Sequence, residues 1–175
     1  MTTIRPVLPT GAPADQVRLL GELESLLLPL AKCDLAHPAA AEATLERFAP
    51  FHSPHMTRIE ALARKGAAEG WLLTKSAGPK VHFGRFLKDF GGYSVDFVWM
   101  EGPAAGHTHT SGEVNLCFAM RGTPLFDGRP PGWVVFAPGS HHIPTVVGGE
   151  MLIVYFVPGG TVAWDKAPAK PAPKA

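Results

Sequence analysis

The stretch that decides the fold of this chain reads Gly106-His107-Thr108-His109-Thr110-Ser111-Gly112-Glu113, and a second stretch, Pro138-Gly139-Ser140-His141-His142, follows it. Side chains two apart in a β-strand lie on one face, so an extended segment directs His107, His109 and Glu113 the same way. Imidazole and carboxylate groups together are ligands for divalent metals such as Fe, Mn, Zn or Ni. The sequence therefore predicts a site for a divalent metal, and we expect no organic cofactor.

The region after Gly70 has the pattern of a mainly β protein. Apolar residues alternate with Ser94 and Asp96 between Tyr93 and Trp99, which is typical of a strand. Further strands are predicted over residues 71–73, 81–83, 114–120, 133–136 and 151–157. Many short strands separated by Gly and Pro turns favour a β-sandwich or a β-barrel.

The alternation continues beyond Glu113 and predicts which side chains share its face. Asn115 and Cys117 are expected to point inward with Glu113, while Leu116 and Phe118 point to the other face. Asn115 would then either orient a substrate or serve as a structural amide. Cys117 is expected to behave as a small buried hydrophobic residue rather than a nucleophile.

The first 70 residues predict helices instead of strands. Leucines between Leu19 and Leu30 recur at helical spacing, and Pro29 is expected to kink or end that helix. Two more helices are predicted over residues 39–48 and from Met56 to about Gly66 or Gly70. We therefore expect three parts: a helical segment (1–70) packed on a β-barrel (71–164), and a disordered Pro/Ala/Lys-rich tail (165–175).

Composition excludes several classes of protein. The chain has 175 residues, of which 46% are hydrophobic, and a formal net charge of +1, which predicts one globular domain without the basic surface of a nucleic-acid-binding protein. No apolar run is long enough to cross a membrane. The two cysteines form no disulfide framework and no signal peptide is evident, so a cytoplasmic location is expected.

The two His-containing stretches resemble the paired motifs of the cupins, small β-barrels that often hold a metal with three His and one Glu. The resemblance implies a single cupin-like jelly-roll barrel. His141 and His142 are adjacent and must point to opposite faces of a strand, so only one can be the fourth ligand. Spacing from Gly139 in cupin-like motifs favours His142, with His141 as the alternative. Barrels of this kind commonly pair through edge strands, so we expect a homodimer.

A longer series of segments resembles one particular family. The series comprises Gly70-Trp71-Leu72, Phe83-Gly84-Arg85, Tyr93-Ser94-Val95-Asp96, Gly106-His107-x-His109 with Gly112-Glu113, Phe126-Asp127-Gly128, Gly132-Trp133-Val134-Val135 and Pro138-Gly139-Ser140-x-His142-x-Pro144-Thr145-Val146. Their order is similar to that in the 4-hydroxylaminobenzoate lyases of bacterial nitroarene degradation, over about residues 70–160. Thr110 departs from the proline that members often carry after the second histidine.

That resemblance implies an enzyme that converts 4-hydroxylaminobenzoate, or a close hydroxylamino aromatic acid, to protocatechuate and ammonia. Catalysis would fall to the candidate metal ligands, since breaking the N–O bond needs a proton or a Lewis acid. Substrate binding is assigned to Arg85, Asn115 and His141. Arg85 would bind the carboxylate through its guanidinium fork, or else form a surface ion pair.

Two other functions fit the same residues. A metal-dependent cupin dioxygenase or isomerase acting on a small aromatic or keto acid would also need His107, His109, Glu113 and His142. A cupin module that binds a small molecule without turnover is the second alternative, because fold by itself does not decide function. Oxygen consumption separates the first of these from a lyase.

Overall fold

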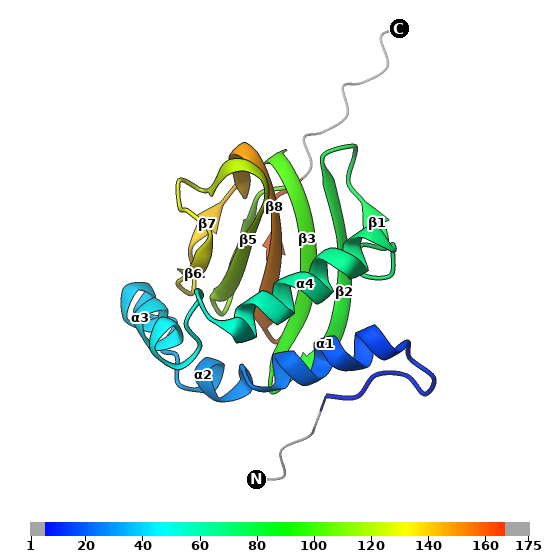
Figure 1. Ribbon diagram of the computed structural model, residues 1–175. Helices are drawn as coiled ribbons and strands as arrows, with labels where there is room; N and C mark the ends of the chain where they lie inside the picture. The colour runs from blue at the N-terminus through cyan, green and yellow to red at the C-terminus, as the bar shows by residue number, and fades with distance from the viewer. Residues whose placement is uncertain (1–5, 167–175) are drawn as a thin grey trace, which may run out of the picture.

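A computed structural model of the chain describes residues 6–166, with four helices ahead of nine strands (Figure 1). The helices are α1 (Ala14–Glu24), α2 (Leu27–Ala31), α3 (Pro38–Phe48) and α4 (Pro54–Ala68). Most of the predicted tail lies outside the described residues. The predictions of helices over 39–48 and from Met56 onward are confirmed, and Ser53 caps α4 by accepting a hydrogen bond from the Met56 N–H.

The leucine-rich helix is interrupted one turn before Pro29. The chain turns at residues 25–26, and α2 restarts at Leu27 with Pro29 in its first turn. A proline ring clashes with the carbonyl four residues earlier and supplies no N–H to it, and that carbonyl belongs to Ser25. The predicted break therefore occurs, but on the N-terminal side of the proline.

The strand predicted over 71–73 is wrong. This segment is irregular, and the Leu72 N–H donates to the carbonyl of Gly66 in the last turns of α4. The Trp71 ring packs so closely against Gly66 that a side chain there would collide with it. The apolar residues of 71–73 therefore complete the end of a helix, and the first strand begins at Lys75.

Two sheets make up the β part of the chain. The larger is six-stranded in the order β1-β2-β3-β8-β5-β6 and the smaller is three-stranded in the order β7-β4-β9. The bounds are β1 (Lys75–Ser76), β2 (Val81–Phe90), β3 (Tyr93–Pro103), β4 (His107–Thr108), β5 (Glu113–Phe126), β6 (Gly132–Phe136), β7 (His141–His142), β8 (Thr145–Pro158) and β9 (Ala163–Trp164). The mainly β, cupin-like class with N-terminal helices is confirmed, although hydrogen bonding leaves the sheets unclosed.

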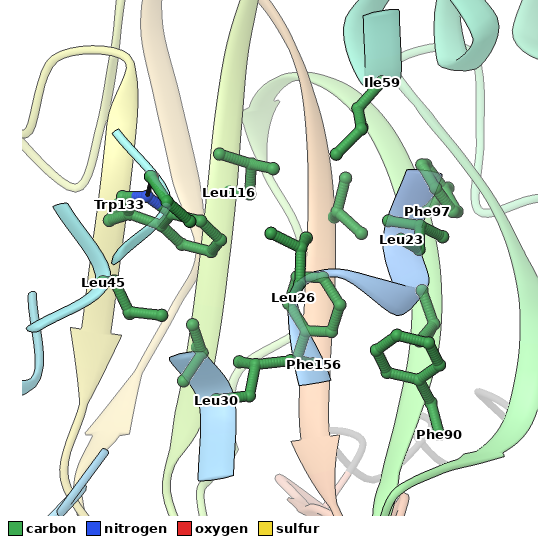
Figure 2. Packing of buried hydrophobic residues seen from close by; sticks show 14 of the residues in the cluster. Leu23, Leu26, Leu30, Leu45, Ile59, Phe90, Phe97, Leu116, Trp133 and Phe156 are labelled. Carbon is green, nitrogen blue, oxygen red and sulfur yellow. Dashed lines mark hydrogen bonds between the residues drawn. The ribbon is translucent and has the colours of Figure 1, made fainter. Parts of the chain in front are cut away.

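The helices cover one face of the large sheet. Figure 2 shows Leu23, Leu26 and Leu30 projecting from the helical segments toward the strands that carry Leu116 and Phe156. All five side chains are at most 1% exposed and belong to one hydrophobic cluster. This helix-facing core also takes in Val114 and Phe118, as the alternation along β5 predicts.

The opposite face of the large sheet has its own, smaller hydrophobic cluster. Cys117, Met151 and Tyr155 belong to it, and they face away from the helices. Burial raises the pKa of the Cys117 thiol far above its usual range, so this residue is an inert part of the packing. Among the described residues, no helix has the length and apolarity that crossing a bilayer requires.

Candidate metal centre

His107, His109 and Glu113 converge, but they do not share one extended segment. His107 lies on β4, His109 follows in a loop, and Glu113 begins β5 in the other sheet. The chain turns at Gly112, whose φ of +85° favours glycine and whose Cα approaches the Phe136 carbonyl too closely for a side chain. The expectation of one strand is therefore wrong, and a turn between two sheets brings Glu113 to the histidines.

His142 completes the group and His141 does not. β7 pairs with β4 so that His142 lies opposite His107 and His141 opposite Thr108. The His141 ring is 48% exposed and its Nε2 lies 3.0 Å from Asp165 carboxylate oxygens, on the other face of the strand. Of the two alternatives left open by the sequence, the geometry favours His142.

The four ligand atoms are suitably placed for a metal ion. One atom each from His107, His109, Glu113 and His142 can be chosen so that all lie within 4.8 Å of one another. Ligands at about 2.0–2.2 Å from a metal are at most about 4.4 Å apart, so the group needs only a small contraction.

Burial strengthens the case for a cation at this place. His107 Nε2, both ring nitrogens of His109, Glu113 Oε1 and His142 Nε2 are buried without a hydrogen-bond partner among the described residues. Each buried polar group left unsatisfied costs about 1–3 kcal/mol. A neutral imidazole has one N–H and one lone pair, so each of the three histidines offers one lone pair and Glu113 adds carboxylate oxygens. Such a group of converging ligands fits a divalent cation.

Hydrogen bonds on the far sides of two rings set their tautomers. His107 Nδ1 lies 3.2 Å from the Ala105 carbonyl, and His142 Nδ1 lies 2.5 Å from Asp127 Oδ2. Both acceptors require an N–H on Nδ1, which leaves the lone pair on Nε2 facing the centre. Burial lowers the pKa of His107 despite the nearby Glu113, so its neutral form, the one that binds metals, is favoured.

Aromatic side chains hold the rings in place. The His109 ring stacks on Phe136 with a centroid distance of 5.1 Å and an interplanar angle of 7°. The Trp164 ring from β9 contacts His107 edge-on at 5.0 Å. Neither contact was expected from the sequence, because β9 pairs with β4 within the small sheet and β6 belongs to the large sheet, and both strands are distant from the histidines along the chain.

A cavity of about 830 Å³ opens beside the cluster. His107 and Glu113 form one part of its wall, and Arg85 and Asp96 form another. The rest of the wall is mostly apolar and comprises Ala77, Val81, Phe83, Val98, Pro103, Ala104, Ala105, Pro144, Val157, Val162 and Trp164, with Lys75, Tyr155, Gly160 and Thr161. A volume of this size accommodates a small aromatic acid.

Arg85 and Asn115, the two other predicted substrate-binding residues, lie in different environments. Arg85 lines the cavity and is paired with Asp96, its Nε donating to Asp96 Oδ1 at 2.8 Å. Asn115 is fully buried and does not line the cavity; it donates to the Val134 carbonyl at 3.3 Å, and its Oδ1 has no partner among residues 6–166. Asn115 therefore combines the structural role and a free acceptor close to Glu113.

Two residues that matter here were not singled out as site residues. Asp127 was named only as part of the family-like segment Phe126-Asp127-Gly128, yet it orients His142. Tyr155 was seen only as part of a strand, yet it lines the cavity and stands opposite Asn115 in the sheet register. Burial raises the pKa of the Tyr155 phenol well above its usual value, so the hydroxyl stays protonated.

A family model and two related proteins with the same description match this chain. The family model described as "PnbB: 4-hydroxylaminobenzoate lyase" matches residues 33–164. A 4-hydroxylaminobenzoate lyase of Nocardioides sp. (strain LMS-CY) is 28% identical over 63% of this chain and 73% of its own length. The Pseudomonas putida protein of the same name is 26% identical over 62% of this chain and 73% of its own length.

Solved structures show a weaker likeness. An RmlC-like cupin protein from Ralstonia eutropha has 13% sequence identity and a TM-score of 0.41, over 53% of this chain and 64% of that chain.

Proposed function

The chain belongs to the 4-hydroxylaminobenzoate lyase family, and we propose that it converts 4-hydroxylaminobenzoate, or a close hydroxylamino aromatic acid, to protocatechuate and ammonia. The overall reaction consumes one water molecule. The N–O bond breaks and the departing hydroxyl leaves as water. One water adds to the ring carbon next to the C–N bond, and a second water replaces the nitrogen, which leaves as ammonia, so the ring gains two hydroxyl groups for a net uptake of one water. The site must therefore bind a benzoate, protonate a departing hydroxyl and deliver water.

One observation carries the proposal beyond family membership. Ligand atoms of four residues lie within 4.8 Å of one another, and two of these residues, His107 and Glu113, form a wall of a cavity large enough for the substrate. An aromatic ring fits the apolar wall provided by side chains such as Phe83 and Val98. The reactive end of the substrate would then meet the polar cluster.

His107, His109, Glu113 and His142 would hold a divalent metal such as Fe, Mn, Zn or Ni. Bound there, the metal would supply Lewis-acid stabilisation of the negative charge that develops on the departing oxygen.

Glu113 is suited to move the proton. Its Oε2 faces the histidines, 3.4 Å from His109 Nδ1 and 4.0 Å from His107 Nε2, while Oε1 has no partner. A proton on Oε1 can pass to the departing hydroxyl, and the resulting carboxylate can take a proton from the attacking water. One carboxyl group thus serves as acid and then as base.

Tyr155 and Asn115 would position the reacting groups. Within residues 6–166 the Tyr155 hydroxyl has one long contact, with Met100 Sδ at 3.9 Å, and would donate to a group in the cavity. Asn115 does not line the cavity, so its Oδ1 would act on the attacking water rather than on the substrate, as an acceptor for a water molecule held beside Glu113. Between them they offer one donor and one acceptor next to Glu113.

The test is an anaerobic incubation of purified protein with 4-hydroxylaminobenzoate, in which protocatechuate and ammonia are followed by chromatography, with and without chelator. Formation of both products in equal amounts supports the lyase. Turnover only in the presence of O₂ supports the dioxygenase alternative, and ligand binding without turnover supports a binding module. Loss of activity in chelator, restored by one metal, identifies the ion.

A cytoplasmic location and a homodimer complete the proposal. One sheet edge is already covered, because Val135 on β6 donates its N–H to Glu42 of α3. A dimer formed through edge strands would therefore use the β1 side of the large sheet. Sedimentation of the purified protein tests the dimer.

A further inference from the structure

Lys75 and Arg85 are two cationic residues on neighbouring strands of the large sheet, away from the candidate metal ligands. Lys75 on β1 is opposite Phe83 on β2, and Arg85 is two residues further along β2. Residues at this diagonal position share a face and lie about 7–8 Å apart. Lys75, Phe83 and Arg85 all line the cavity, as that geometry requires.

Part of the Arg85 guanidinium is already engaged. Its Nε and Nη2 donate to the two Asp96 oxygens at 2.8 and 3.2 Å, and Nη2 also donates to the Gly160 carbonyl at 3.2 Å. Ser94 in turn donates to Asp96 Oδ2 at 2.7 Å and fixes that carboxylate. The fork expected to bind a substrate carboxylate is therefore occupied, and only the two N–H groups of Nη1 remain for a ligand.

Lys75 differs from the neighbouring cations. It is exposed at the cavity and forms no ion pair with residues 6–166, whereas Lys80 pairs with Glu101 and Arg85 with Asp96. Because Asp96 already balances the Arg85 charge, the ammonium of Lys75 is the net positive charge at this end of the cavity. A singly charged anion would restore neutrality.

We propose that Lys75 Nζ and Arg85 Nη1 together form the subsite for the carboxylate of an aromatic acid. This inference rests on the proposed function and determines the orientation of the substrate. The carboxylate lies between Lys75 and Arg85, the ring lies along Phe83 and Val98, and the para substituent points toward Glu113. Asp96 acts as a positioning residue that holds Nη1 toward the cavity.

The sheet register supports this orientation. Arg85 lies opposite Asp96, Asp96 opposite Tyr155, and Tyr155 opposite Asn115, which forms one row across four strands. Neighbouring strands are about 4.8 Å apart, so the row spans about 14 Å between its end Cα atoms. Side chains reaching inward from both ends leave room for a para-substituted benzoate between them.

The experiment measures binding of two unreactive probes, 4-hydroxybenzoate and its uncharged analogue 4-hydroxybenzamide, by calorimetry. In Lys75→Gln we expect benzoate binding to weaken about tenfold and benzamide binding to stay unchanged. Lys88→Gln is the matched control. Lys88, on β2, is exposed like Lys75 but does not line the cavity. Wild-type benzoate affinity should also fall as salt is raised, because the charges are exposed.

The outcomes separate this subsite from the proposed reaction. Equal benzoate affinity in wild type and Lys75→Gln overturns the subsite, even if the enzyme turns over 4-hydroxylaminobenzoate. Charge-dependent binding that requires Lys75, without any lyase turnover, supports the subsite and overturns the reaction. If turnover occurs, Lys75→Gln should raise KM about tenfold and leave kcat within about twofold.

Discussion

The two faces of the six-stranded sheet differ in the kind of side chain that they bury. On the helix-facing side, leucines of α1 and α2 and strand residues such as Phe156 form a large apolar cluster. On the other side the apolar cluster is smaller, and the buried residues beside it include His107, His109, Glu113 and Asn115. Among the described residues, the buried side-chain polar atoms that lack a hydrogen-bond partner all lie on or beside the second face.

The helix-facing side therefore contributes most of the free energy of unfolding, whereas the unpaired polar atoms on the other side reduce it. Apolar burial contributes about 25 cal/mol per Å² removed from water, and unpaired buried polar groups subtract from it. Buried atoms that lack partners in the folded chain are the ones expected to gain partners from a metal and a substrate. Substitutions on the two faces should therefore separate folding from function.

The largest effect is expected for Glu113→Gln on the cavity face. Turnover should fall at least about 10³-fold, since the variant loses both a carboxylate ligand and the proton carrier. In chelator, its free energy of unfolding should equal or exceed that of wild type, because a neutral amide replaces a buried carboxylate whose Oε1 has no partner among the described residues. Steady-state kinetics and denaturant unfolding measure the two quantities.

Glu101→Gln is the matched control for that experiment, because Glu101 pairs with Lys80 and does not line the cavity. A Glu113→Gln variant that keeps turnover within tenfold of wild type would contradict a catalytic role for this face.

The next largest effect is expected for Leu26→Ala on the helix-facing side. Leu26 is completely buried, so the variant should lose about 3 kcal/mol of unfolding free energy through the cavity left behind. Activity per folded molecule should be retained. Leu28→Ala, at a position that is 62% exposed, should change stability by less than about 0.5 kcal/mol. Equal losses of unfolding free energy in Leu26→Ala and Leu28→Ala would contradict a role of Leu26 in the core.

A smaller effect is expected for Asp127→Asn, because Asp127 Oδ2 supports His142 while Oδ1 accepts a hydrogen bond from the Thr145 N–H, which an amide oxygen can also accept. Asparagine tolerates the Asp127 φ of 48°, so the turn is preserved. The amide would present N–H to His142 Nδ1 and favour the tautomer whose Nε2 carries a proton and cannot bind a metal. Metal affinity should fall about 10–100-fold. Asp165→Asn, whose side chain hydrogen-bonds His141 and none of the four candidate ligands, should leave the affinity unchanged in a competition titration.

The smallest effect is a pH dependence of stability in the metal-free protein. Burial lowers the pKa of His107 below 6.5, so below that pH the unfolded chain binds a proton that the folded chain does not. Stability should therefore fall as pH drops from 6.5 toward the folded pKa, by at most about 1.4 kcal/mol per pH unit. His107→Gln should flatten the slope of unfolding free energy against pH in chelator. An unchanged slope would show that other groups cause it.

Much of the fold was readable from local patterns. Leucine spacing predicted the N-terminal helices, and alternation from Tyr93 to Trp99 predicted β3. The segment 71–73 was misread because three apolar residues fit either a short strand or the end of a helix. Only contact with Gly66 decides between the two, and that contact depends on how α4 packs.

The candidate site was partly readable as well. Residue types and spacing alone pointed to His107, His109 and Glu113, because few local patterns place three such ligands within seven residues. The supporting residues Asp127 and Tyr155 carried no such signal, because an aspartate in a turn and a tyrosine in a strand are common in any β protein. Their roles depend on which strands lie opposite one another.

The sequence by itself determined the class of fold, the helical segment ahead of the strands, and the ligand types of the site, since these depend on local periodicity and side-chain chemistry. Only the tertiary structure decided that Glu113 reaches the histidines across a turn and that His142 faces inward rather than His141. It also decided that Asp96 occupies the fork of Arg85. Strand register and the meeting of two sheets set these distances, and both depend on residues far apart along the chain.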